Sequence, residues 1–174
     1  MLIDCDTLDS GCNGGLTQYA LTWIAKYGGV MTEADYPYRG TKGACRSDPS
    51  KYVDMKVTGF KIITDLNLAR WCVDEDKIKE LLYATAPLPA VLNADPLRTY
   101  ISGIIDVSAD ECPLSGINLA VLIVGYGIDS TGKGYWIVKN SWGKNWGESG
   151  YFRIRRGNGT CGINCNIIIA SISF

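Results

Sequence analysis

Residues 134–147 read GYWIVKNSWGKNWG and pass from a strand pattern into a turn bounded by glycines. Residues 135–138 are aromatic or β-branched, the side chains that favour a β-strand. The turn that follows places the amide of Asn140 and the indoles of Trp142 and Trp146 close together in the sequence. Taken alone, these residues are typical of a core strand that runs into an aromatic loop.

The composition is that of an ordinary globular protein, with 174 residues, 47% hydrophobic and 20% charged. This length can bury one sizeable core or two small lobes. The formal net charge of -1 argues against nucleic acid or an anionic membrane as a partner held by charge. No apolar run approaches the roughly 18 residues that span a bilayer. The first residues, MLIDCD, do not have the pattern of a signal peptide.

Cysteine and histidine counts restrict the chemistry further. Seven cysteines suggest disulfides and an oxidising compartment. Because no export signal is visible, either the chain begins inside a longer precursor or the cysteines are reduced, and we favour the precursor. The sequence contains no histidine, which excludes imidazole ligands and imidazole bases within it.

The 134–147 stretch resembles the asparagine-bearing segment of the papain-like cysteine peptidases, and the resemblance covers essentially the whole chain. It begins inside the family's mature domain. The other matching segments are LIDCD (2–6), SGCNGG (10–15), TEADYPY (32–38), PLPAVLNA (87–94), YISGI (100–104), SGINLAVLIVGYG (115–127), GYFRIRRG (150–157) and CGI (161–163).

The resemblance implies an α+β, papain-like fold of two lobes. Residues 1–62 would form the remainder of a helical left lobe, and residues 63–174 an antiparallel, β-barrel-like right lobe with a C-terminal return. The left lobe would lack its central helix, so we expect an apolar surface that an upstream segment or a second chain completes.

The family pattern also implies the disulfides Cys5–Cys45 and Cys112–Cys161. The family partner of Cys12 belongs to a segment that this sequence does not contain, so we expect Cys12 to be free. Cys72 and Cys165 are additional to the common pattern and can either bond to each other or stay reduced.

Asn140 matches the asparagine that orients the catalytic imidazole in the family, and Trp142 matches the tryptophan that shields that hydrogen bond. The family's LNHAV reads INLAV here, so Leu119 occupies the histidine position. The segment that carries the nucleophilic cysteine, QGxCGSCWAF in the family, is not found in the sequence. Asn140 is therefore expected to be vestigial. In the analogous serine triad, loss of the base alone lowers kcat by about 10⁶.

Substrate-binding roles come from the same resemblance. Gly14 and Gly15 match glycines that line the non-primed subsites, where paired glycines let a peptide backbone approach closely. The main specificity pocket would be lined by Leu16, Thr17, Val91, Ile117, Ala120 and Asn166. These residues are mostly apolar and suggest a hydrophobic side chain as ligand, although plain core packing is the alternative interpretation.

The spacing of residues also predicts local elements. Apolar residues at helical spacing predict an amphipathic helix over 16–27 with a buried aromatic stripe, and residues 57–63 a strand. Acids at 74–76 are placed to start a helix whose buried face holds Ile78, Leu81 and Leu82. Pro89 predicts an edge strand or a local distortion.

Two further segments carry polar features. We interpret the tyrosines of TEADYPY as buried, and the arginines of GYFRIRRG as a solvated strand face. Asn158-Gly159-Thr160 is a glycosylation sequon that requires entry into the secretory pathway.

Three hypotheses of function follow from these patterns. The leading one is a catalytically inactive homologue of a cysteine peptidase that keeps part of a peptide groove and binds a peptide, a propeptide or a cystatin-like inhibitor. The second is a fragment of an active endopeptidase, and the third is a structural or storage protein without a ligand. No cofactor or metal is expected, and the expected location is the secretory pathway, a lysosome or vacuole, or the extracellular space.

Overall fold

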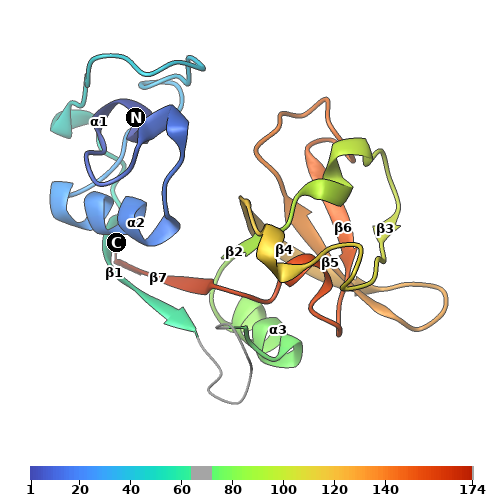
Figure 1. Cartoon of the computed structure of the whole chain (residues 1–174). Coiled ribbons are helices and arrows are strands. Elements are labelled where there is room, and N and C mark those ends of the chain that lie inside the picture. Colours follow the sequence, from blue (N-terminus) through green and yellow to red (C-terminus); the bar gives the residue numbers. More distant parts are fainter. Residues whose placement is uncertain (64–71, 174) are drawn as a thin grey trace. The chain divides into compact units, whose positions relative to one another are not determined.

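The computed structural model describes residues 1–63 and 72–173 (Figure 1). The chain divides into two compact units, residues 1–61 with 170–174, and residues 62–169. None of the described helices is long and apolar enough to cross a membrane.

The first unit is mostly helical and loop structure. Its elements are α1 (Leu2–Cys5), the 3-10 helix η1 (Gly11–Asn13), α2 (Thr17–Tyr27), the 3-10 helix η2 (Pro49–Lys51) and most of the strand β1 (Lys56–Ile63). β1 pairs with the last strand, β7 (Ile167–Ser173), in a two-stranded sheet. A small core of Cys5, Trp23 and Tyr36 holds the unit together.

The predicted helix over 16–27 is present as α2. It ends where Gly28 adopts a left-handed conformation, with φ 90°, and donates its N–H to the carbonyl of Ile24. The predicted burial of its aromatic stripe is wrong in part. Trp23 is 1% exposed, but Tyr27 stacks on it from the outside and remains 48% exposed.

The tyrosines of the 32–38 segment also differ from one another. Tyr36 is buried, donates its hydroxyl hydrogen bond to Asp4 Oδ2 at 2.8 Å, and accepts one from the N–H of Arg46 at 3.1 Å. Tyr38 is 69% exposed, so its predicted burial is wrong. Pro37 lies between the buried Tyr36 and the exposed Tyr38.

The second unit is built on a five-stranded sheet with the order β2-β4-β5-β6-β3. β2–β4, β4–β5 and β5–β6 are antiparallel, and the short β3 lies parallel to β6. Among the described strands this sheet is open, with β2 and β3 at its edges, and does not close into a barrel. Its elements are α3 (Glu75–Ala84), β2 (Leu88–Leu92), η4 (Asp95–Thr99), β3 (Ile104–Ile105), η5 (Leu114–Gly116), β4 (Leu119–Ile128), β5 (Gly134–Lys139), β6 (Tyr151–Arg155) and η6 (Thr160–Gly162).

Pro89 lies in the edge strand β2, opposite Leu122 of β4, as its missing N–H predicts. The helix start at 74–76 is also confirmed. Asp74 caps α3 by accepting the N–H groups of Asp76 and Lys77 on its carboxylate, which satisfies donors that have no partner inside the helix.

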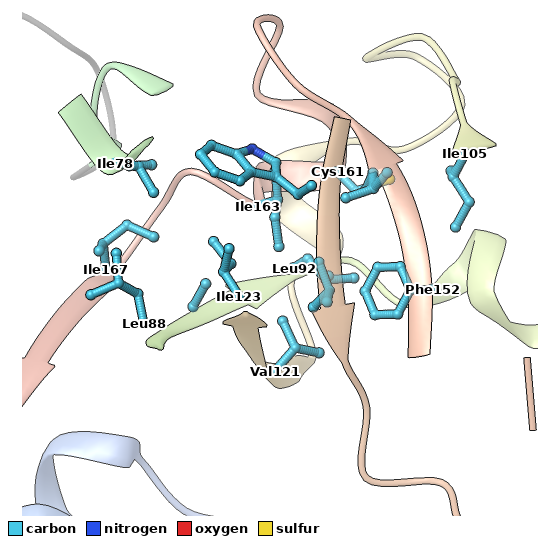
Figure 2. Packing of buried hydrophobic residues seen from close by; sticks show 14 of the residues in the cluster. Ile78, Leu88, Leu92, Ile105, Val121, Ile123, Phe152, Cys161, Ile163 and Ile167 are labelled. Carbon is cyan, nitrogen blue, oxygen red and sulfur yellow. The ribbon is translucent and has the colours of Figure 1, made fainter. Parts of the chain in front are cut away.

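The core of the second unit lies between the sheet, α3 and the start of β7 (Figure 2). Ile123, Trp136 and Phe152 from three adjacent strands are each 0% exposed. Burying a side chain of this size contributes about 1.5–3 kcal/mol relative to leaving it in water. From α3, Ile78 is fully buried, and Leu81 and Leu82 pack against the cluster while partly exposed.

The arginines of β6 are not a solvated strand face, which corrects that prediction. The side chain of Arg155 is 10% exposed and donates to Asp106 at 2.9 Å and to Asp129 at 2.8 Å. Arg153 binds Glu148 through two guanidinium nitrogens. Both acids of the Arg155 pair come from loops distant in sequence, so a local pattern cannot indicate them.

Three disulfides cross-link the chain. Cys5–Cys45 lies in the first unit, and Cys72–Cys165 and Cys112–Cys161 lie in the second. The sequence left two states open for Cys72 and Cys165, and the structure joins them over a separation of 93 residues. Cys12 carries a free, exposed thiol.

Candidate functional site

Leu119 and Asn140 lie at the same end of one strand pair. β4 begins at Leu119 and β5 ends at Lys139, immediately before Asn140. The two strands are antiparallel and Leu122 pairs with Lys139, so the start of one is adjacent to the end of the other. The Leu119 side chain packs, partly exposed, against the hydrophobic core.

Asn140 is 8% exposed, and both its backbone N–H and its side-chain oxygen form hydrogen bonds. Its N–H donates to the carbonyl of Gly150 at 3.0 Å, and its Oδ1 accepts the N–H of Ser141 at 2.7 Å. That second bond fixes the orientation of the amide, because only the oxygen can accept. The Nδ2 group is then buried with no hydrogen-bond partner among the described residues. A buried donor without a partner costs about 1–3 kcal/mol.

The two tryptophans of the loop after β5 form an edge-to-face pair with ring centroids 5.1 Å apart. Trp142 is 40% exposed. Trp146 is more buried and packs against Tyr100 and Phe152, at 5.6 Å and 6.0 Å between centroids. Trp146 therefore anchors the loop on the core, and Trp142 presents an indole surface to solvent.

An ion pair that the sequence did not indicate fixes the far end of the same loop. Arg153 Nε and Nη2 donate to the Glu148 carboxylate at 2.9 Å and 2.6 Å, and the N–H of Gly103 donates to the same carboxylate at 2.9 Å. The Arg153 guanidinium lowers the pKa of Glu148, and the carboxylate raises the pKa of Arg153. Burial raises the pKa of the neighbouring Tyr100 hydroxyl. The signal available in the sequence was the pairing of an acid and a base five residues apart.

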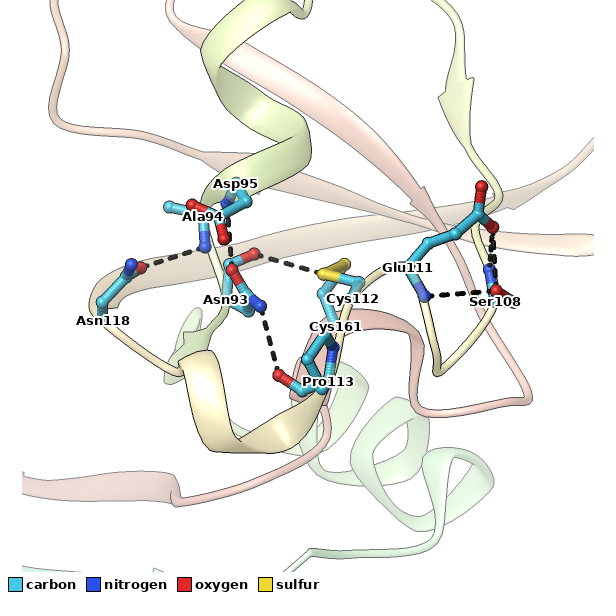
Figure 3. Close-up of a disulfide and its surroundings, with 9 residues drawn as sticks. All are labelled: Asn93, Ala94, Asp95, Ser108, Glu111, Cys112, Pro113, Asn118 and Cys161. Atoms are coloured by element: carbon cyan, nitrogen blue, oxygen red, sulfur yellow. Dashed lines mark hydrogen bonds between the residues drawn. A yellow bond between two sulfur atoms is a disulfide. The ribbon is translucent and has the colours of Figure 1, made fainter.

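Two asparagines position the segment that leads into Leu119 (Figure 3). Asn118 Oδ1 accepts the N–H of Ala94 at 3.0 Å, and its own N–H donates to the carbonyl of Leu92 at 3.1 Å. Asn93 donates from Nδ2 to the carbonyl of Pro113 at 3.1 Å and accepts the N–H of Asp95 at 3.0 Å. The Asn118 bonds tie the start of β4 to the end of β2, and the Asn93 bond to Pro113 ties the end of β2 to the segment after Cys112. Sequence reasoning did not identify either asparagine.

The residues expected to line a specificity pocket fall in both units. In the second unit, Val91 and Ala120 are paired across β2 and β4, and Leu119 is paired with Leu92. Ile117 follows η5, and Asn166 has a left-handed backbone with φ 51°. The structure thus brings Val91 and Ala120 together, where β2 ends and β4 begins.

The expected subsite residues of the first unit lie around the start of α2. Gly14 ends η1 with φ 101°, and Leu16 is the N-cap residue of α2, immediately before Thr17. The N–H of Leu16 donates to Asp9 Oδ1 at 2.9 Å. A side chain at Gly15 would collide with Asp9 and would force the Asp9 side chain, with its bond to the N–H of Leu16, to shift. The substrate role of these four positions stays a prediction.

The chemistry of this end of the sheet is therefore that of hydrogen bonding and apolar contact. A leucine side chain neither accepts nor donates a proton, so position 119 offers no general base. Trp142 offers an exposed ring and Ala120 an exposed small side chain, whereas the Nδ2 donor of Asn140 is buried.

Comparison with known proteins agrees with this fold. The profile described as "Papain family cysteine protease" matches residues 1–171. The chain is 42% identical over 163 residues to the viral cathepsin of Lymantria dispar multicapsid nuclear polyhedrosis virus, covering 93% of this chain and 42% of that protein. It is 45% identical over 162 residues to the viral cathepsin of Spodoptera litura multicapsid nucleopolyhedrovirus, covering 93% of this chain and 44% of that protein.

Among solved structures, the digestive procathepsin L2 proteinase from Tenebrio molitor larval midgut superposes with a TM-score of 0.85 at 34% identity. The match covers 98% of this chain and 51% of that one. The chain belongs to the papain family of cysteine proteases. It spans less than half the length of the two viral cathepsins.

Proposed function

We propose that this chain is a catalytically inactive member of the papain family that retains part of a peptide-binding groove. The observation that carries the proposal is the leucine at position 119 in a sequence without any histidine, since the resemblance of INLAV to the family's LNHAV assigns this position to the catalytic histidine. Position 119 lies inside the matched region, so its leucine belongs to the part of the chain that resembles the family.

The surroundings of position 119 support the same conclusion. A cysteine peptidase needs an imidazole to hold its nucleophile as a thiolate and to protonate the leaving amine. The oxygen of Asn140, the atom able to accept an imidazole N–H, accepts the N–H of Ser141. Leu119 is instead engaged in packing against the core.

Binding without cleavage would use the groups that remain. Trp142 and Ala120 are exposed, and Val91 lies beside Ala120 in the sheet. These apolar groups fit an extended peptide with a hydrophobic side chain, a propeptide, or a cystatin-like inhibitor. Disulfides and cathepsin-like relatives suggest a protein of the secretory pathway or a lysosome.

A second candidate is a piece of an active cysteine endopeptidase. Two observations favour it. The relatives are viral cathepsins, and the chain spans only 42% and 44% of their length, as a piece of such a protein would. On this hypothesis another part of the protein would supply the nucleophile, and a base would have to reach the site from a residue other than Leu119.

The deciding experiment uses the natural protein with any residues that precede Met1, after mass spectrometry has confirmed leucine at position 119. We expect no thiol-dependent cleavage of fluorogenic peptides and no covalent labelling by a thiol-directed epoxide at a nucleophilic cysteine. Thiol-dependent cleavage would overturn the proposal and establish the endopeptidase.

Binding is tested separately by fluorescence polarisation of hydrophobic peptides and of a cathepsin propeptide. Ala120→Arg should weaken binding because it places a charged side chain beside Val91. Ala84→Arg, at an exposed position on α3, should leave binding unchanged. A folded protein that binds neither ligand would favour the structural or storage hypothesis.

A further inference from the structure

The Asn158-Gly159-Thr160 sequon is the one sequence of its type in the chain, and it runs from the loop after β6 into the first residue of η6. Asn158 is exposed, and its side chain makes no hydrogen bond with any residue that the structure describes. It borders a pocket of about 580 Å³ whose walls include Val107 and Ser108, so the space beside it is open.

Two backbone hydrogen bonds on either side of Asn158 hold this residue outward. The N–H groups of Gly157 and Gly159 both donate to Oε1 of Glu75, at 2.9 Å and 2.6 Å. Both glycines have positive φ, 113° and 61°, which other residues rarely adopt. The backbone on either side of Asn158 therefore points inward to one carboxylate oxygen, and the asparagine is left at the apex.

We propose that Asn158 carries an N-linked glycan, and that it is attached before the Cys112–Cys161 disulfide closes. The acceptor and its exit path are free in the folded chain. The three disulfides place folding in an oxidising compartment, where N-glycosylation of such sequons takes place.

The order of events follows from the third residue of the sequon. The transferase must recognise the hydroxyl of Thr160 together with the Asn158 amide. In the folded chain Thr160 is 5% exposed, and Cys161, next to it, is 3% exposed and bonded to Cys112. The folded loop thus exposes the Asn158 amide but leaves little of Thr160 accessible beside it, so recognition must precede folding of this segment.

The covalent step uses a lipid diphosphate-linked oligosaccharide as co-reactant. A bond forms between Nδ2 of Asn158 and C1 of the first sugar, while the bond between C1 and the diphosphate oxygen breaks. The lipid diphosphate leaves with the electron pair, and Nδ2 loses one proton. No oxidant or reductant is needed.

The test directs the chain, with any natural upstream residues, into the secretory pathway of a eukaryotic cell. Peptide N-glycosidase should remove a single mass increment from the secreted protein and leave aspartate at position 158 in the mapped peptide. Thr160→Ser should keep the increment. Thr160→Val, of nearly the same shape, and Asn158→Gln should lose it. Secreted, folded protein with unmodified Asn158 would overturn the proposal.

The timing is tested with Cys112→Ser/Cys161→Ser, analysed in the cell lysate as well as the medium because this variant can be retained. We expect a larger glycosylated fraction than in the parent chain. Cys12→Ser is the matched control and should not change it, because Cys12 is unpaired. An equal fraction in the disulfide variant and the parent would refute the proposed order.

Discussion

The carboxylate of Glu75 joins the first turn of α3 to Trp136 at the centre of the sheet. Glu75 Oε2 accepts the indole N–H of Trp136 at 2.5 Å, and both residues are buried. Its other oxygen accepts the N–H groups of Gly157 and Gly159. One side chain therefore satisfies three buried or partly buried donors from two distant segments, which explains how a carboxylate is accommodated in the core.

Glu75→Gln should destabilise the fold because the amide replaces one acceptor oxygen by a donor. Either the Trp136 indole or the two loop N–H groups then lose their partner, and we expect a loss of about 2–3 kcal/mol in the free energy of unfolding. Urea denaturation followed by tryptophan fluorescence measures it. Glu80→Gln, an exposed position on the same helix, is the control. Equal midpoints for the two variants would contradict this role for Glu75.

The pairing of Arg155 with Asp129 predicts a pH-dependent contribution to stability. Hydrogen bonds from the Thr131 hydroxyl, and next from Arg155, hold the pKa of Asp129 well below its usual value. Because the folded pKa is depressed, the stabilisation is present above the unfolded pKa of about 3.9 and is lost as pH falls below it.

Asp129→Asn should therefore lower the free energy of unfolding at neutral pH and lower it progressively less as the solution is acidified below about pH 4. Denaturant titrations of parent and variant across this range measure the difference. Asp110→Asn, at an exposed position, should shift stability little at any pH. A constant difference between parent and Asp129→Asn down to the most acidic sample would show that the ionised carboxylate is not the source.

The Glu148–Arg153 pair should control the order of the loop that carries Asn140 and Trp142. Arg153→Lys keeps the positive charge but cannot donate two parallel hydrogen bonds to one carboxylate. We expect faster amide hydrogen exchange over residues 141–150, measured by mass spectrometry. Arg98→Lys, in an exposed pair with Asp95, is the matched control and should leave that exchange unchanged. Unchanged exchange in both variants would mean that Trp146 packing alone orders the loop.

The sequence predicted those features of the fold that depend on residues close to one another in the chain. The strand at 134–139, the helix over 17–27 and the edge position of Pro89 follow from side-chain shape, glycine stops and a missing donor, all of which are local. The exposure of Tyr27 and Tyr38 could not be predicted in this way, because it depends on which distant parts of the chain cover these side chains.

The same distinction applies to the candidate site. The motif around Asn140 and the leucine at position 119 were readable in the sequence, and the structure places both residues at the same end of β4 and β5. The burial of Arg155 was not predictable, because its acids lie 49 and 26 residues away. Likewise, the unsatisfied Nδ2 of Asn140 requires the position of every neighbouring acceptor.

The Cys72–Cys165 disulfide should be a major source of stability in the second unit. It joins the segment before α3 to the segment before β7 and closes a separation of 93 residues. In the chain-entropy model, cross-linking a loop of this length restricts the unfolded chain by about 4.5 kcal/mol. Cys72→Ser/Cys165→Ser should lower the free energy of unfolding by an amount of that order, measured by denaturant titration without reductant. Cys12→Ser provides the comparison, since its thiol is free and exposed, and it should change stability little. If the double variant unfolded at the same denaturant concentration as Cys12→Ser, the unfolded chain would already be restricted without the bond, and the disulfide would have no stabilising role.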